Sequence, residues 1–127
     1  MNAAQDPEVD AVRRAYAAFA AGDIEAAVAD VADDVIWIEP DEFPNGGLHR
    51  GREAVRAYLR ESRAMWQHLR SAATVFRRGE RMIAHHHVDG ILLDGRRQEV
   101  TVADVYTFDH GRVVHMQAYA TPAEVPL

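Results

Sequence analysis

The second half of the sequence is divided by turn motifs at residues 78–80 (RGE), 94–95 (DG) and 109–111 (DHG). Asp-Gly is typical of a tight β-hairpin, and glycine-containing turns commonly separate strands. We therefore expect four strands, at residues 71–78, 81–93, 97–108 and 112–120. Because neighbouring strands that are joined by short turns pair antiparallel, this half predicts a curled, mostly antiparallel sheet.

The first half of the sequence predicts three helices. Asp6 is a suitable N-cap, Pro7 fits the first helical position, and Gly22 fits the end of the first helix. A second, shorter helix is expected to end at residues 33–34, and a third to cover about residues 52–66. Short strands are expected at residues 35–39 and 48–50. Three helices followed by an antiparallel sheet define an α+β fold.

The composition narrows the chemistry that the chain can support. Its 127 residues are enough for one domain, residues 1–127, and its net charge of -6 disfavours a nucleic-acid partner. The sequence has no cysteine, and all 14 basic residues are arginine. Thiol nucleophiles, thiolate metal sites and Schiff bases on lysine are therefore excluded. We see neither a membrane-spanning apolar run nor a leader in residues 1–6, so we expect a cytoplasmic protein without a membrane partner.

Two carboxylates interrupt the apolar faces of predicted strands. Alternation places Glu39 on one face with Trp37, and it places Asp104 on one face with Val102 and Tyr106. A carboxylate on an apolar face has to be paired, hydrogen-bonded or protonated. Two of them in a small chain predict a pocket that performs acid–base chemistry. The alternatives are a solvent-facing strand end for Glu39 and a structural pairing with histidine or arginine for Asp104.

Six short stretches match a known arrangement in their order and spacing. They are residues 15–23 (AYAAFAAGD), 32–35 (ADDV), 37–40 (WIEP), 49–55 (HRGREAV), 105–108 (VYTF) and 111–114 (GRVV). Together they resemble the nuclear transport factor 2-like superfamily, in particular its SnoaL-like and ketosteroid-isomerase-like branch. The resemblance implies a cone-shaped, curved, mixed sheet wrapped around three N-terminal helices, with a pocket on its concave side and commonly a homodimer through its outer face. The family includes isomerases, cyclases, dehydratases and non-catalytic binders, so the fold alone does not define the reaction.

The resemblance also assigns roles to both carboxylates. Glu39 matches the general base of ketosteroid isomerases, and Asp104 matches the carboxylic acid that helps to hold the oxyanion in those enzymes. The oxyanion tyrosine of those enzymes falls on Ala15 here, and its supporting tyrosine falls on Leu59. Tyr16 is the next residue, but one helical step turns a side chain by about 100°. We therefore expect Tyr16 to point to a different spot on the pocket wall.

Three consecutive histidines, residues 85–87, can face either side of their strand. The resemblance places His85 and His87 on the concave side, whereas alternation with the apolar residues of the same strand would place His86 there. We follow the resemblance and expect His87 to relay a proton near Asp104. A metal site is not expected, because the local spacing fixes no third ligand beside two histidines and a carboxylate.

These observations define a candidate site and function. The predicted catalytic residues are Glu39, Asp104 and His87, and the predicted substrate-binding residues are Tyr16, Phe19, Trp37, His85, Val102, Tyr106, Met116 and Ala118. We expect a homodimeric isomerase or cyclase that needs no cofactor and enolises a small, apolar, carbonyl-bearing ligand. The alternatives are a binding module without chemistry and a dehydratase that uses a histidine with Asp104.

Overall fold

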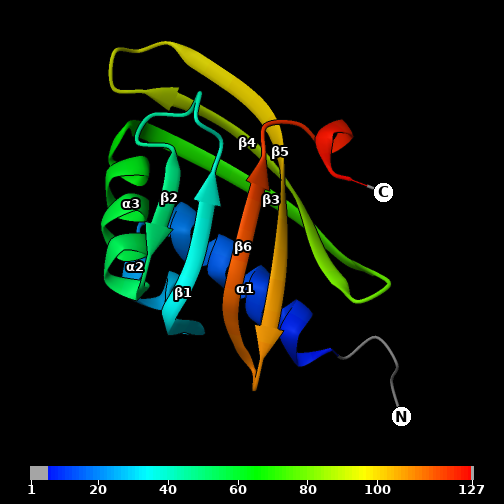
Figure 1. Cartoon of the computed structure of the whole chain (residues 1–127). Coiled ribbons are helices and arrows are strands. Elements are labelled where there is room, and N and C mark those ends of the chain that lie inside the picture. The colour runs from blue at the N-terminus through cyan, green and yellow to red at the C-terminus, as the bar shows by residue number, and fades with distance from the viewer. Residues whose placement is uncertain (1–5, 127) are drawn as a thin grey trace.

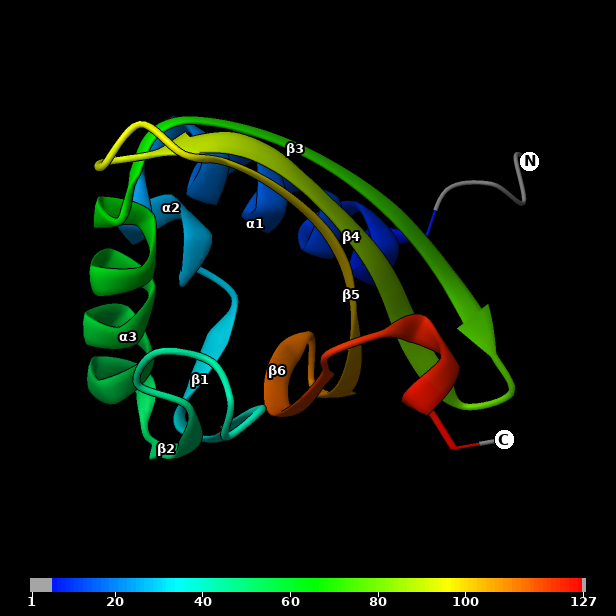
Figure 2. The same cartoon turned by 90° about the horizontal axis from the view of Figure 1, so that it is seen from above.

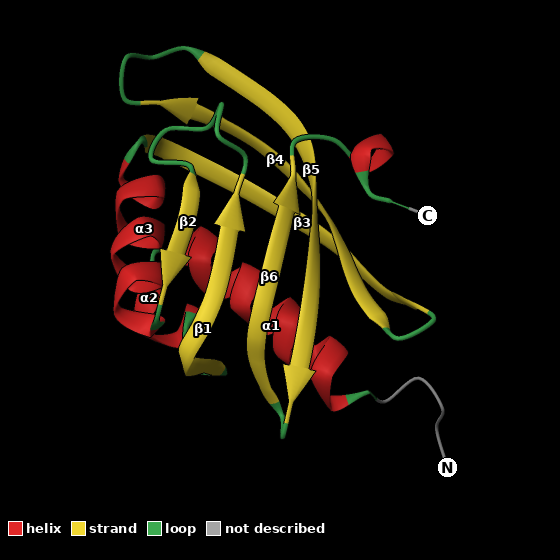
Figure 3. Cartoon of the chain, viewed as in Figure 1, coloured by secondary structure: helices red, strands yellow, loops and turns green. Residues whose placement is uncertain are grey.

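The computed structural model describes residues 6–126 and has an α+β architecture, as predicted (Figure 1). Helices and strands follow one another as α1 (Pro7–Ala21), α2 (Ile24–Ala27), β1 (Val31–Glu39), β2 (Gly47–Arg50), α3 (Arg52–Ala64), β3 (Trp66–Arg78), β4 (Arg81–Leu92), β5 (Arg97–Asp109) and β6 (Arg112–Tyr119), with a short 3-10 helix at Pro122–Glu124 (Figure 3). The prediction about a leader concerns residues 1–6, of which residues 1–5 lie outside the described residues.

The six strands form one curved sheet in the order β2-β1-β6-β5-β4-β3. Neighbouring strands pair antiparallel, apart from β1 and β6, which run parallel. Figure 2 shows β3, β4 and β5 sweeping in an arc, with α1 against the inner side of the arc and α3 across the space that it encloses. The predicted mixed sheet curved around the helices is therefore confirmed, although the sheet does not close on itself.

The ends of α1 follow the sequence signals. The Asp6 side chain accepts a hydrogen bond from the backbone N–H of Glu8, and Gly22 ends the helix in the left-handed conformation with φ of 82°. Arg77 of β3 donates hydrogen bonds to the side chains of Asp6 and Glu8. These contacts fix the start of α1 against the edge strand β3.

The predicted boundaries are wrong in two places along the chain. α2 ends at Ala27 and β1 already begins at Val31, because Val31 is buried and pairs with Val113 of β6. β3 begins at Trp66 rather than at residue 71, because Trp66 pairs with Leu92 of β4. In both places long-range strand pairing overrides a local pattern of apolar residues.

Buried side chains gather on both faces of the sheet. The main core lies between the helices and the concave face, and includes Val12, Val35, Val55 and Met82. On the opposite face, Val125 from the segment after β6 packs against Ile83 and Ala103. The concave face therefore carries the main core, and a cavity lies on the same face. Among residues 6–126, no helix is both long and apolar enough to cross a lipid bilayer.

Candidate active site

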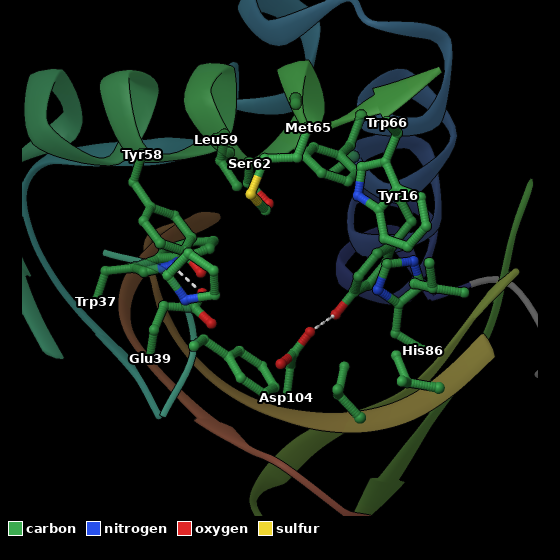
Figure 4. A pocket seen from close by; sticks show the side chains of 18 of the residues that line it. Tyr16, Trp37, Glu39, Tyr58, Leu59, Ser62, Met65, Trp66, His86 and Asp104 are labelled. Carbon is green, nitrogen blue, oxygen red and sulfur yellow. Dashed lines mark hydrogen bonds between the residues drawn. The ribbon is translucent and has the colours of Figure 1, made fainter. Parts of the chain in front are cut away.

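A cavity of about 260 Å³ opens between the helices and the concave face of the sheet (Figure 4). Its wall is mostly apolar and is built from the three α-helices, from β1, β3, β4 and β5, and from connecting segments. The lining residues are Ala15, Tyr16, Phe19, Ala27, Trp37, Glu39, Phe43, Pro44, Tyr58, Leu59, Ser62, Met65, Trp66, His86, Val88, Gln98, Val100, Val102, Asp104, Tyr106 and Ala120. A mostly apolar cavity with a few convergent polar groups is the usual form of a small-ligand site.

Glu39 is the last residue of β1, and its side chain enters the cavity. The indole Nε1 of Trp37, two residues earlier on the same face, donates a hydrogen bond to Glu39 Oε2 at 2.7 Å. Burial raises the pKa of Glu39 to about 8, and the negative charge of Asp104 adds to the rise. Hydrogen bonding from Trp37 and Tyr58 opposes the rise without cancelling it. Glu39 is therefore a half-buried carboxyl group poised to exchange a proton close to neutral pH.

Asp104 lies in the middle of β5, between two alanines of neighbouring strands, Ala84 and Ala118. The hydroxyl of Tyr16 donates a hydrogen bond to Asp104 Oδ2, and the hydroxyl of Tyr106 donates one to the Tyr16 oxygen at 2.8 Å. Burial raises the pKa of Asp104 to about 6, while the bond from Tyr16 lowers it. The small neighbours leave room for the tyrosine ring above the carboxylate.

The structure corrects the predicted direction of Tyr16. Ala15 and Leu59 line the cavity, as the resemblance implies, but the hydroxyl groups come from the adjacent residues Tyr16 and Tyr58. Burial raises the pKa of Tyr16 and of Tyr58, so that both phenols stay protonated and can donate hydrogen bonds. Tyr58 was missed in the sequence, although its position three residues after the buried Val55 placed it on the inner side of α3.

The prediction that His85 and His87 face the cavity is wrong. Successive side chains of β4 alternate between the faces, and the fully buried Met82 and Ala84 set the register, so His86 points inward. His87 lies on the opposite face, where its Nε2 contacts Glu99 Oε2 at 2.9 Å. His85 also lies outside the lining and packs its ring against Phe76. A dehydratase mechanism that pairs Asp104 with His85 or His87 is therefore not supported, because neither histidine lies in the cavity wall.

The other predicted wall residues divide into two groups. Tyr16, Phe19, Trp37, Val102 and Tyr106 line the cavity, whereas Met116 and Ala118 do not. Met116 is buried in the core because it pairs with both Trp37 and Tyr106, whose larger side chains reach past it. Ala118 is too short to extend beyond its partner Asp104.

His86 is the histidine of the cavity wall. Its Nε2 lies 2.5 Å from the Ser71 hydroxyl, and its ring packs against Tyr16 with a centroid separation of 4.4 Å. Burial, with a smaller contribution from His87, lowers the pKa of His86 to about 4, so that the ring is neutral at physiological pH. Within residues 6–126, no group of three or more metal-ligating side chains comes together.

The fold and the site define a small α+β protein with a mostly apolar cavity that contains two carboxyl groups. The family model of the SnoaL-like domain matches residues 12–116, and the chain belongs to this family. No curated protein matches the chain.

Solved structures with the same fold extend over nearly the whole chain. An NTF2-like protein of unknown function from Burkholderia pseudomallei K96243 is 27% identical, with a TM-score of 0.80 over 94% of this chain and 95% of that one. A putative polyketide cyclase from Pseudomonas putida KT2440 is 21% identical, with a TM-score of 0.77 over 94% and 96%. TerC, co-crystallised with polyporic acid, is 20% identical, with a TM-score of 0.78 over 93% and 94%. The latter two similarities concern the fold.

Proposed function

We propose that this protein is an isomerase- or cyclase-type enzyme that moves a proton next to the carbonyl group of a small, mostly apolar ligand. The observation that carries the proposal is the pair of carboxyl groups, the half-buried Glu39 and the buried Asp104, in the wall of one cavity. Their pKa values are raised to about 8 and about 6, so the pair holds one proton at neutral pH. One carboxyl group can therefore accept a proton while the other donates one.

In this reaction the ionised Glu39 removes a proton from the carbon next to the carbonyl. The electron pair moves to the carbonyl oxygen, and the resulting enolate oxygen is stabilised by hydrogen bonds from Asp104 in its protonated form and from Tyr16, whose hydroxyl then donates to the enolate in place of Asp104. Glu39 then returns its proton to another carbon of the ligand, so the reaction is an isomerisation that consumes no second reactant. Tyr106 supports the site by donating its hydroxyl proton to the Tyr16 oxygen.

The competing function is ligand binding without turnover. It is favoured by the higher pKa of Glu39, because the shared proton then resides mainly on Glu39 and the amount of ionised base is small. TerC, which has a similar fold, was co-crystallised with polyporic acid. A binding module would give a saturable complex with ketones and form no product.

The experiment that tests the proposal is the isomerisation of a β,γ-unsaturated cyclohexenone, followed by the absorbance of the conjugated product. Deuterium uptake from heavy water, measured by mass spectrometry, reports the same proton transfer. Glu39→Gln is expected to lower kcat/KM by roughly 10²–10⁴-fold. His87→Gln is the matched control, because His87 faces away from the cavity, and should keep wild-type turnover. Equal turnover by the wild type and Glu39→Gln would exclude the mechanism.

A further inference from the structure

His86 lies on the part of the cavity wall that the proposed proton transfer does not use, and it is paired with Ser71, which does not itself line the cavity. Figure 4 shows Glu39 and His86 on opposite sides of the cavity, with Asp104 between them. His86 is 7% exposed and lines the cavity together with the apolar side chains of Val88 and Val102. A buried polar group in such surroundings needs a hydrogen-bond partner for each of its polar atoms.

One ring nitrogen of His86 has such a partner and the other does not. Nε2 is 2.5 Å from Ser71 Oγ, and no hydrogen bond joins Nδ1 to any side chain or backbone group of residues 6–126. Nδ1 is also not among the buried polar side-chain atoms without a partner in this part of the chain. Nδ1 therefore keeps some exposed surface, and because His86 lines the cavity, we expect a ligand atom to reach Nδ1 there.

The neutral imidazole of His86 can bind either a hydrogen-bond acceptor or a hydrogen-bond donor of the ligand through Nδ1. If the Ser71 hydroxyl donates to Nε2, then Nδ1 carries the proton and donates into the cavity. If Nε2 donates to Ser71 Oγ instead, then Nδ1 accepts. A ligand hydroxyl group can pair with Nδ1 in either tautomer, whereas a ligand carbonyl oxygen can pair with Nδ1 only when Nδ1 carries the proton.

We propose that His86, held by Ser71, is a second polar contact for the ligand and selects carbonyl compounds that carry a further hydroxyl or carbonyl oxygen on the side away from Glu39. The inference rests on the proposed function, because the proposed function fixes the orientation of the ligand in the cavity. Its reacting carbonyl is held by Tyr16 and Asp104, and the rest of the ligand extends toward His86. His86 acts here as a specificity-determining residue. The apolar side chains around it accommodate the carbon skeleton of the ligand.

The test compares two phenols of the same skeleton, 2-naphthol and 2,6-dihydroxynaphthalene, by fluorescence titration of the full chain. Both offer one hydroxyl to Tyr16 and Asp104, and the second offers another to His86. The wild type is expected to bind the diol about threefold to tenfold more tightly, the worth of one neutral hydrogen bond. His86→Phe should remove this preference, His86→Gln should restore part of it, and His87→Phe on the opposite face should keep it.

Equal affinity of the wild type for both phenols would overturn the inference, as would an undiminished preference in His86→Phe. If His86→Phe does not fold by circular dichroism, Ser71→Ala takes its place. That variant should reduce the preference because the imidazole is no longer held, and an unchanged preference would then count against the inference. The titration needs no turnover. A preference for the diol without isomerisation of cyclohexenone would contradict the proposed reaction alone, and turnover without the preference would contradict the role of His86 alone.

Discussion

The hydroxyl of Tyr16 donates a hydrogen bond to the carboxylate of Asp104, although the two residues lie 88 positions apart. The contact joins the middle of α1 to the middle of β5 across the concave face of the sheet. Tyr106 extends it by donating to the Tyr16 oxygen. One helix and one strand thus hold a chain of two phenols that ends on a buried carboxylate.

This chain of hydrogen bonds predicts different costs for its two tyrosines. Tyr16→Phe removes the hydroxyl that contacts Asp104 and, in the proposed reaction, the enolate oxygen, so we expect kcat/KM to fall by roughly 10²–10³-fold. Tyr106→Phe removes one supporting hydrogen bond, and we expect a loss of roughly threefold to tenfold. Steady-state kinetics of the two variants provide the comparison, and equal losses would contradict this order.

The two raised pKa values predict a bell-shaped pH profile. Below pH about 6 both carboxyl groups are protonated and no base is present, whereas above about 8 both are ionised and Asp104 cannot donate. We therefore expect kcat/KM to be highest near neutral pH. In Asp104→Asn the amide donates at any pH and the charge that raises the pKa of Glu39 is gone. The alkaline limb should then disappear, and the remaining acid limb should report Glu39 alone, whose pKa lies below about 8 without the Asp104 charge but is still raised by burial. An unshifted bell in this variant would refute the coupling of Glu39 to Asp104.

The same burial makes the stability of the protein depend on pH. The folded-state pKa values of Glu39 and Asp104 lie above their unfolded values of about 4, so ionisation opposes folding. Their contribution to stability is fully present below pH about 4 and is lost as pH rises through about 8. Urea unfolding between pH 5 and 9 should show a falling free energy of unfolding from this source. Glu39→Gln should flatten the decline, whereas Glu42→Gln, which replaces a nearby exposed carboxylate, should not.

Gly90 predicts a steric test of the cavity wall. A methyl group on Gly90 would lie 2.3 Å from the His68 carbonyl oxygen and 2.7 Å from Trp66 Cε3. Gly90→Ala should therefore displace Trp66, change tryptophan fluorescence and destabilise the fold by about 1–3 kcal/mol. Gly95→Ala is the control, because a methyl group there meets no atom within 4 Å and costs only backbone strain at φ of +88°. A wild-type fluorescence spectrum in Gly90→Ala would contradict the tight contact.

Much of the fold follows from local signals in the sequence. The N-cap Asp6 and the left-handed Gly22 delimit α1, and the Asp94-Gly95 turn joins β4 to β5. The start of β1 at Val31 could not be predicted in this way, because it depends on Val113, which is distant in the sequence. Local patterns thus define which elements form, while pairing between distant strands decides where several of them begin.

In the candidate site, too, local patterns predict some side-chain directions, whereas long-range packing determines others. Alternation along β4 was the better guide to its histidines, since a strand cannot turn His85 and His87 inward while it buries Met82 and Ala84 on that face. The direction of Tyr16 was harder to predict, because it depends on how α1 is rotated against the sheet. That rotation is determined by packing that spans the whole chain.

The parallel pairing of β1 with β6 has a consequence for how the protein is made. Glu39 belongs to β1 and Asp104 to β5, and β6 is the strand that lies between them. During synthesis, β1 therefore keeps an unpaired edge until residues 112–119 have left the ribosome, and the two acids are brought together last. Sheets built from such distant partners fold slowly, and their open edges invite aggregation. A chain stopped before β6 would carry both acids on strands that are not yet joined in one sheet.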